Sequence, residues 1–172
     1  MLETYKNLIA NQYEAALSTL NTCIDRCPPD AWNGPVGNLA FCQAVFHTLF
    51  FADCYLGIDT EALKAQAFHR ENVDFFRDYE EMEDREQKLL YDKPAITKYV
   101  EHCRRKGLAT IAAETEETLK ARCGFYWLEF TRAELYVYNI RHIQHHAAQL
   151  SLRLRLNKAA EIPWEKSAWR DS

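Results

Sequence analysis

The sequence predicts an all-α protein with four main helices in a single domain. Apolar residues recur at three- and four-residue steps over several long stretches, and we find no strand pattern and no internal repeat. Of the 172 residues, 48% are hydrophobic, with only 5 glycines and 5 prolines. This composition is typical of a helical globule with one core. We expect one domain over residues 1–172, with an irregular tail at residues 157–172.

The first two predicted helices are separated by a loop. Residues 2–26 place their apolar side chains on one helical face, and Pro28-Pro29 ends that helix. Residues 30–37 contain the Gly, Asn and Pro residues that favour a loop. Asn38 is expected to cap a second helix that is apolar nearly all round and stops at Gly57. Such a helix should lie in the middle of the molecule.

A charged excursion follows the second helix. Asp59-Thr60 can cap a segment that extends from Glu61 to about Lys88. Between Glu71 and Lys88 there are eight acidic and three basic residues. We expect a long helical excursion, either a solvated helix or helices with loops, lying across the main helices. The functional alternative is a lid that shapes a pocket.

The third main helix is predicted after Pro94. Thr97 can cap a helix from residue 98 to about residue 122, and its apolar positions follow helical spacing. Gly107 interrupts this pattern and is expected to bend the helix. Gly124 is expected to end it.

The last helix is predicted to be the longest. Glu129 or Thr131 opens it, and it continues to about Leu156. Beyond it, Trp164 and Trp169 lie in a short irregular segment. We expect these tryptophans to seal one end of the helical core, and a contact with a partner is the alternative.

Three of the six histidines fall within five residues of this last helix. His142 and His146 are four residues apart, so their rings lie about 40° apart around the axis and about 6 Å apart along it. Two such side chains can hold one metal ion. The Glu of the H-E-x-x-H zinc motif is missing here, so a third ligand has to come from elsewhere. Histidines on helices are also commonly structural, and that alternative stays open.

Polar residues also interrupt the predicted inward face of the last helix for about two turns. That face consists of Leu135, Tyr138, His142, His145 or His146, Gln149, Leu152 and Leu156. His47 lies within the apolar second helix, where an imidazole needs a polar partner. A metal ion shared with His142 and His146 would be such a partner. Three imidazoles leave coordination positions open, as expected of a catalytic metal site.

Several other side chains can support these ligands. Gln43 and Tyr138 each lie one turn before a ligand, although simple helix packing explains them equally well. His145 is a substitute ligand, a base near the metal or an exposed residue. His69 and His102 lie in charged surroundings and are expected at the surface.

Composition excludes several classes of function. The formal net charge is −4 with both signs spread along the chain, so no basic surface for nucleic acid is expected. The N-terminal segment does not resemble a signal peptide. Residues 39–58 are mostly apolar, but Gln43, His47 and Asp53 favour a helix buried in protein over one in a membrane. We therefore expect a soluble, cytoplasmic protein.

The six cysteines form no C-x-x-C pair and several occupy apolar helical positions. Cys23 and Cys27, four residues apart, could form a second metal or redox site. We favour unpaired core or surface thiols.

The histidine pattern resembles that of the DinB superfamily of metal-dependent proteins. In that family the apolar second helix carries one histidine, and the last helix carries His-x-x-x-His followed three residues later by Gln. Here His47, His142, His146 and Gln149 match these positions. The family often has Arg-Gly before the Gln, whereas this chain has Ala147-Ala148.

The resemblance implies an up-down-down-up four-helix bundle, often a homodimer, that binds zinc, nickel or iron through the three histidines. It implies a metal-dependent enzyme acting on a small molecule, either a hydrolase or an S-transferase that uses a low-molecular-weight thiol. A non-catalytic metal-binding or stress-related protein is the alternative. A third hypothesis is a helical bundle whose histidines only form hydrogen bonds.

Overall fold

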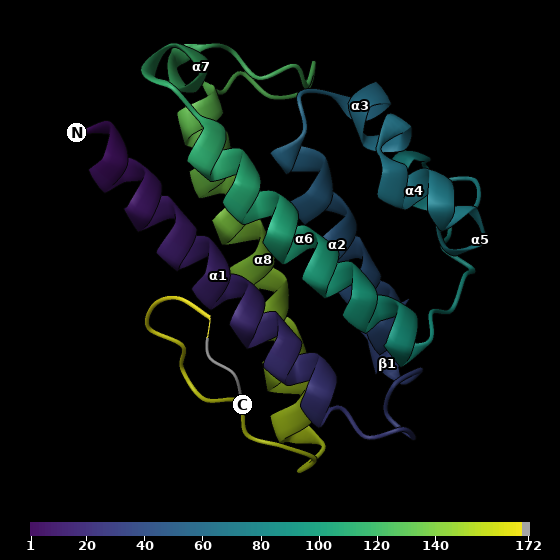
Figure 1. Cartoon of the computed structure of the whole chain (residues 1–172). Coiled ribbons are helices and arrows are strands. Elements are labelled where there is room, and N and C mark those ends of the chain that lie inside the picture. Colours follow the sequence, from purple (N-terminus) through teal and green to yellow (C-terminus); the bar gives the residue numbers. More distant parts are fainter. Residues whose placement is uncertain (170–172) are drawn as a thin grey trace.

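A computed structural model describes residues 1–169. Most of them are helical, which confirms the all-α class (Figure 1). The long helices are α1 (Leu2–Arg26), α2 (Phe41–Leu56), α6 (Lys93–Ala113) and α8 (Arg132–Leu156). The short elements are β1 (Pro35–Val36), β2 (Leu39–Ala40), α3 (Thr60–Ala65), α4 (Ala67–Glu71), α5 (Val73–Phe76), the 3-10 helix η1 (Glu80–Met82) and α7 (Glu116–Lys120).

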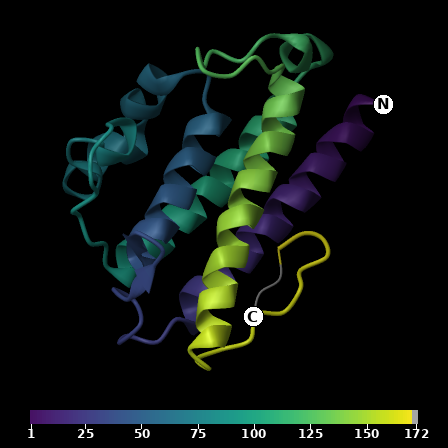
Figure 2. The same ribbon diagram turned by 180° about the vertical axis from the view of Figure 1, so that it is seen from behind.

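The long helices pack side by side around a shared core. Both α1 and α2 pack against α6 and against α8. Seen from either side, α6 and α8 lie between α1 and α2 on opposite faces of the molecule (Figures 1 and 2). Helices α1 and α8 run in one direction, and α2 and α6 run in the other. The short helices α3 to α5 lie beside α2, on the side away from α1.

Helix α1 has the bounds that its apolar spacing predicts, ending just before Cys27 and the Pro28-Pro29 pair. Its Tyr13 is completely buried and donates a hydrogen bond to the carbonyl of Cys103 in α6 (3.1 Å). The ring of Tyr13 lies directly against Gly107, where a Cβ atom would overlap it. Gly107 therefore allows α1 and α6 to approach closely. Helix α6 continues through Gly107, and the predicted bend there stays a prediction.

The loop before α2 contains a small antiparallel hairpin of β1 and β2, so the prediction of no strand is wrong at this point. Gly37 has a positive φ of 62° in its turn, which glycine adopts without strain. Asn38 also lies in this turn and does not cap the helix. The N-cap is Ala40, whose backbone N–H donates to Oε1 of Gln43 (2.8 Å). At the other end α2 stops at Gly57, as predicted.

Helix α2 is the most enclosed element of the described chain. Of its 16 residues, all are buried except His47 and Phe51. These two are four residues apart and therefore lie on one face of the helix. The partly exposed face of α2 is thus the face that carries its histidine.

The excursion is broken into short pieces, so the alternative of helices with loops is confirmed. Asp59 caps α3 as predicted, accepting a hydrogen bond from the N–H of Ala62 (2.7 Å). Arg77 and Tyr79 have positive φ angles of 46° and 58°. A helix cannot continue through residues in this conformation, so the chain turns at these positions.

A buried carboxylate attaches the excursion to the long helices. Asp53 of α2 has no solvent exposure. Its Oδ2 accepts hydrogen bonds from Nε2 of His69 (2.9 Å), Nε2 of Gln66 (3.0 Å) and the hydroxyl of Tyr99 (3.0 Å). The ammonium group of Lys106 donates to its Oδ1. These contacts connect α2, α4 and α6 through one side chain.

The contacts of Asp53 outweigh the penalty of burying its charge. Burial alone would raise the pKa of Asp53, but hydrogen bonds from His102 and His69 and the charge of Lys106 hold it well below its usual range. Burial lowers the pKa of His69, so its neutral ring donates to Asp53 and accepts from the hydroxyl of Tyr79 (3.1 Å).

The predicted surface positions of His69 and His102 are therefore wrong. His69 is 1% exposed, and His102 is half-buried, stacked on Phe68 with ring centroids 4.1 Å apart. The excursion packs on α6 through the stacked rings of Phe68 and His102, whereas the charged residues next to the two histidines in sequence are exposed.

Helix α6 begins at Lys93, earlier than predicted. Asp92 is its N-cap and accepts from the N–H of Ala95 (2.7 Å). Pro94 lies in the first turn, where a missing N–H costs no helical hydrogen bond. Thr97, the predicted cap, lies inside the helix. The helix also ends sooner than predicted, at Ala113, so that Gly124 belongs to the loop after α7.

The C-terminal tail returns along α1 (Figure 2). The N–H of Ala168 donates to the carbonyl of Asn11 in α1 (2.9 Å). Trp169 packs under the guanidinium of Arg104, 4.5 Å from its ring centroid. Trp164 is 73% exposed. The predicted sealing role is wrong for both, because Trp169 packs beside the middle of α6 rather than at an end of the core, and Trp164 is exposed.

Two further sequence predictions concern cysteines and membranes. All six cysteines are buried and free within the described chain, so they are core thiols rather than surface thiols. None of the helices within residues 1–169 has the length and apolar character that crossing a membrane requires.

We predict that Asp53→Ala lowers the unfolding free energy by about 3 to 5 kcal/mol, because Lys106 then stays half-buried without its counter-charge. Asp59→Ala, which removes only the cap of α3, should cost about 1 kcal/mol. Urea unfolding followed by circular dichroism measures both values. Equal losses for the two variants would contradict the role given to Asp53.

Candidate metal centre

The histidine-bearing face of α8 lies beside its core-facing stripe. The helix begins after Thr131, whose side chain accepts from the N–H of Glu134 (3.2 Å), and ends at Leu156, both as predicted. Its buried residues are Leu135, Tyr136, Asn139, Ile143, Ala147, Leu150 and Leu154. The prediction that histidines interrupt the inward stripe is therefore wrong, because the stripe lies one position further along the helix. Asn139 is its polar member, donating to the carbonyl of Ala52 (2.9 Å).

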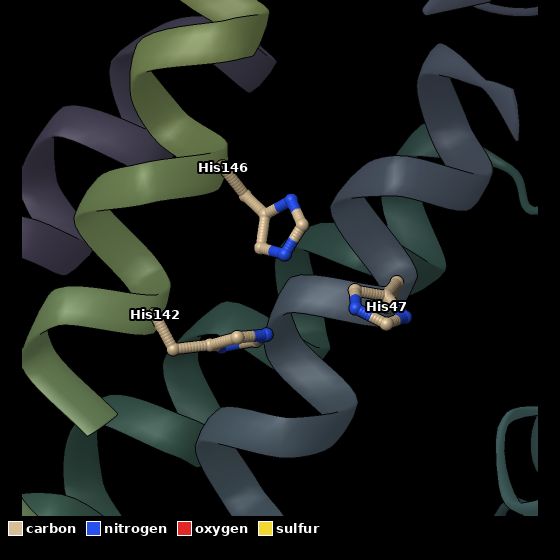
Figure 3. A group of neighbouring side chains, drawn as sticks. All are labelled: His47, His142 and His146. Atoms are coloured by element: carbon tan, nitrogen blue, oxygen red, sulfur yellow. The ribbon is translucent and has the colours of Figure 1, made fainter. Parts of the chain in front are cut away.

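The structure brings together His47, His142 and His146, the three predicted ligands. One ring nitrogen from each lies within 4.8 Å of the other two. Ring centroids are 5.6 Å apart for His47 and His142, 4.9 Å for His47 and His146, and 4.7 Å for His142 and His146. Figure 3 shows the rings from α2 and α8 directed into the space between these helices.

A zinc ion would require these rings to move closer by a small amount. Zinc–nitrogen bonds of about 2.0–2.1 Å in a tetrahedral site place the nitrogens about 3.3 Å apart. The nitrogens here are within 4.8 Å of one another, so the rings would have to approach one another before all three could bind one ion. The donor set, three imidazoles and no thiolate, is suited to zinc, nickel or iron.

His142 shows the clearest need for a ligand. Its Nδ1 is buried and has no hydrogen-bond partner among the described residues. A buried polar atom without a partner costs about 1–3 kcal/mol. A metal ion or a water molecule bound at this nitrogen would remove that cost.

The electrostatics of the cluster favour neutral imidazoles. Burial, followed by the neighbouring His146 and His47, lowers the pKa of His142 from 6.5 to about 3. Burial and His47 likewise lower the pKa of His146 to about 4, although its hydrogen bond with Gln149 acts in the opposite direction. Both rings are therefore uncharged at neutral pH, with lone pairs available for a cation.

Gln149 holds one ligand and keeps His145 away from the group. Its Oε1 is 3.1 Å from Nδ1 of His146, which we assign as the donor. This leaves Nε2 of His146 free. The amide nitrogen of Gln149 lies 3.0 Å from Nε2 of His145, an exposed residue. His145 therefore does not belong to the ligand group.

The residue that sequence reasoning missed is Glu81. Its Oε2 lies 2.7 Å from Nδ1 of His47, and its side chain is only 1% exposed. Glu81 belongs to the acidic segment predicted to be solvated or to form a lid. The sequence holds no signal that separates Glu81 from the seven other acidic residues there, because the fold of η1 and its neighbouring turns decides which one points inward.

Gln43 does not support the ligands directly. Its side-chain amide donates to the carbonyls of Gln87 and Leu89, both at 3.0 Å. The predicted support of His47 by Gln43 is therefore wrong. Instead, Gln43 binds the segment that follows Glu81, which keeps that segment against α2.

Tyr138 lies at the edge of the candidate site. Its ring packs against Tyr55 and Phe130, with centroids 5.3 and 5.2 Å away. It also lines an open hollow of about 490 Å³ with Arg141, His142, Gln144 and His145. A second hollow, of about 450 Å³, reaches His146 and Gln149 from the side of the hairpin. Small molecules can thus approach the histidines from two sides.

A larger hollow, of about 730 Å³, lies at the other end of the molecule and contains none of the three histidines. Its cations already have partners. Arg132 donates to Glu114 (2.9 Å) and to the carbonyl of Leu56 (2.7 Å), and Lys106 donates to Asp53. We therefore place the candidate site at the histidines, where the buried Nδ1 of His142 has no hydrogen-bond partner among the described residues.

Comparison with known proteins gave no match: no family model, no curated protein and no solved structure is significantly similar to this chain.

We predict that the metal-free protein loses stability as the pH falls from about 7 to about 5. The pKa values of His142 and His146 are lowered on folding from 6.5 to about 3 and about 4. The contribution of the two neutral histidines to the free energy of unfolding is therefore complete above pH 6.5. It decreases below that pH, because the unfolded chain takes up protons that the folded chain excludes. Urea unfolding at several pH values should show this slope, and His142→Asn should reduce it. An unchanged slope in that variant would refute the assignment.

Proposed function

We propose that this chain is a divalent-metal-dependent enzyme whose metal ion is held by His47, His142 and His146. The observation that carries the proposal is the convergence of three ring nitrogens within 4.8 Å, one ring having a buried nitrogen without a described partner. If the three imidazoles served only to form hydrogen bonds, each ring should have a hydrogen-bond partner. His47 and His146 have such partners in Glu81 and Gln149, and His142 does not.

An open coordination sphere supports catalysis over a purely structural metal. Three protein ligands leave at least one position for water or substrate. The side chain of His47 is 25% exposed, and His142 borders the hollow of about 490 Å³. A bound metal ion would lower the pKa of a coordinated water or thiol and so supply a nucleophile at neutral pH. Tyr138 and Arg141 line the approach, where they can bind polar groups of a small substrate.

The proposal includes a fold and a family. We propose an up-down-down-up four-helix bundle of the DinB type, possessing the long excursion between its second and third main helices. The helix directions in Figure 1 and the packing of α1 and α2 on α6 and α8 support this topology. The matching positions of His47, His142, His146 and Gln149 support the family. On that basis the reaction is a hydrolysis or an S-transfer from a low-molecular-weight thiol, carried out by a homodimer.

One observation favours a second candidate, a metal-binding protein without turnover. The residues lining the hollow beside His142 all belong to α8, so the hollow is open to solvent rather than enclosed between elements. A metal ion bound at such an open surface would stay in contact with solvent water, without an enclosed pocket for a substrate. Assays of turnover on the metal-loaded protein decide between the two candidates.

Metal binding is tested on protein purified without a polyhistidine tag. We expect one zinc, nickel or iron ion per chain by plasma mass spectrometry, and a loss of affinity above about 100-fold in His142→Ala and His146→Ala. His145→Ala is the matched control, since this exposed neighbour lies outside the ligand group. It should keep the metal. Absence of metal after incubation with all three ions would leave a helical bundle with a polar histidine cluster.

Catalysis is tested next, on the metal-loaded protein. We expect hydrolysis of an ester or amide, or conjugation of a low-molecular-weight thiol with an electrophile, in the wild type and not in His142→Ala. A protein that binds one metal ion tightly but turns over neither substrate class would favour the non-catalytic alternative.

A further inference from the structure

The excursion delivers one carboxylate to the histidine cluster. Glu81 of η1 meets His47 of α2 through the 2.7 Å contact between Oε2 and Nδ1. The carboxylate is almost completely withdrawn from solvent, at 1% exposure. Its second oxygen, Oε1, is buried and has no hydrogen-bond partner within residues 1–169. A carboxylate buried with a single partner is costly, so its retention here calls for an explanation.

The position of Glu81 is fixed by contacts on both sides of it. Before it, the hydroxyl of Tyr79 lies 3.1 Å from Nδ1 of His69, whose other nitrogen binds Asp53. Beside it, the carboxylate of Glu80 turns the opposite way and accepts from the backbone N–H groups of Lys88 (3.0 Å) and Leu89 (3.2 Å). Glu80 therefore closes the loop, and Glu81 faces the histidines.

The segment after Glu81 is held against α2 as well. The amide of Gln43, one turn before His47, donates to the carbonyls of Gln87 and Leu89. The loop that carries Glu81 is therefore attached at both ends to the helix that carries His47. This arrangement keeps the carboxylate and the imidazole in a constant relative position.

The chemistry of the contact determines which nitrogen of His47 can bind a metal. A carboxylate oxygen accepts a hydrogen bond from a ring N–H, so a neutral ring in this contact carries its proton on Nδ1. The lone pair then lies on Nε2. A carboxylate acceptor on the far nitrogen also makes the imidazole a stronger donor to a metal ion, and it fixes the ring orientation.

We propose that Glu81 is a positioning residue of the metal centre, holding His47 in the Nδ1–H form with Nε2 available to the ion. The inference rests on the proposed three-histidine metal site and adds a residue from the excursion to it. The excursion is then neither a solvated arm nor a movable lid, because it supplies the carboxylate that orients one ligand.

The test compares variants of two glutamates in the same segment. Zinc affinity is measured by competition with a chromogenic chelator for the wild type, Glu81→Gln, Glu81→Ala and Glu86→Gln. We expect Glu81→Gln to weaken zinc binding about 10-fold and Glu81→Ala up to about 100-fold. Glu86→Gln is the matched control, because it removes an exposed carboxylate from the same segment. It should keep the wild-type affinity.

A second readout reports the proton position without any metal. In 15N spectra of the metal-free protein, His47 should show a protonated Nδ1 and an unprotonated Nε2, and Glu81→Ala should change this pattern while thermal melts confirm that it remains folded. Cobalt(II) spectra of the loaded proteins then report whether the ligand geometry changes with it.

The outcomes separate the two proposals. A wild type that binds zinc, together with Glu81 variants of equal affinity, would refute the role of Glu81 and leave the metal site standing. An equal loss in Glu86→Gln, or a wild-type His47 protonated on Nε2, would refute it as well. A wild type that binds no metal would refute the metal site and the inference together.

Discussion

The enclosure of α2 determines how the rest of the structure is arranged. This helix is apolar nearly all round, and α6, α8 and the excursion cover it from different directions. Burial of so much apolar surface fixes its position strongly. Only His47 and Phe51 among its residues keep partial exposure. The helix therefore presents one imidazole at a defined place, and the packing of α8 brings His142 and His146 to the same place.

Two polar clusters lie along α2, and they differ in how fully their polar atoms are hydrogen-bonded. Asp53 has several donors around it, including His69, Tyr99 and Lys106, so its hydrogen-bonding capacity is largely used. A saturated buried network stiffens the fold and specifies one arrangement. The histidine cluster is incomplete, since His142 Nδ1 and Glu81 Oε1 have no partners among the described residues. The two clusters therefore differ in how completely their buried polar atoms are hydrogen-bonded.

Much of the helical framework could be predicted from the sequence because periodicity and capping act locally. The bounds of α1 and the cap at Thr131 follow from the apolar spacing and the residue types. The start of α6 was misplaced because Pro94 was interpreted as a break, whereas proline also fits a first turn. The hairpin before α2 was missed because strands of two residues show no alternation.

The candidate site could be predicted only in part, since its ligands and its supports obey different rules. The three histidines were found from spacing and from family resemblance. The argument from an interrupted core stripe in α8 was wrong, because the true stripe includes Ile143 and Ala147 and the histidines flank it. Glu81 and His69 depend on how the excursion folds back, which long-range contacts decide and local sequence does not encode. Predictions of surface exposure failed at those positions.

The central claim, that three imidazoles from α2 and α8 share one metal ion, is tested most directly by X-ray absorption at the zinc edge of the loaded protein. The account predicts a first shell of nitrogen or oxygen at about 2.0–2.1 Å, with outer-shell scattering that requires three imidazoles. A shell containing sulfur at about 2.3 Å, or scattering from fewer than three imidazoles, would contradict it.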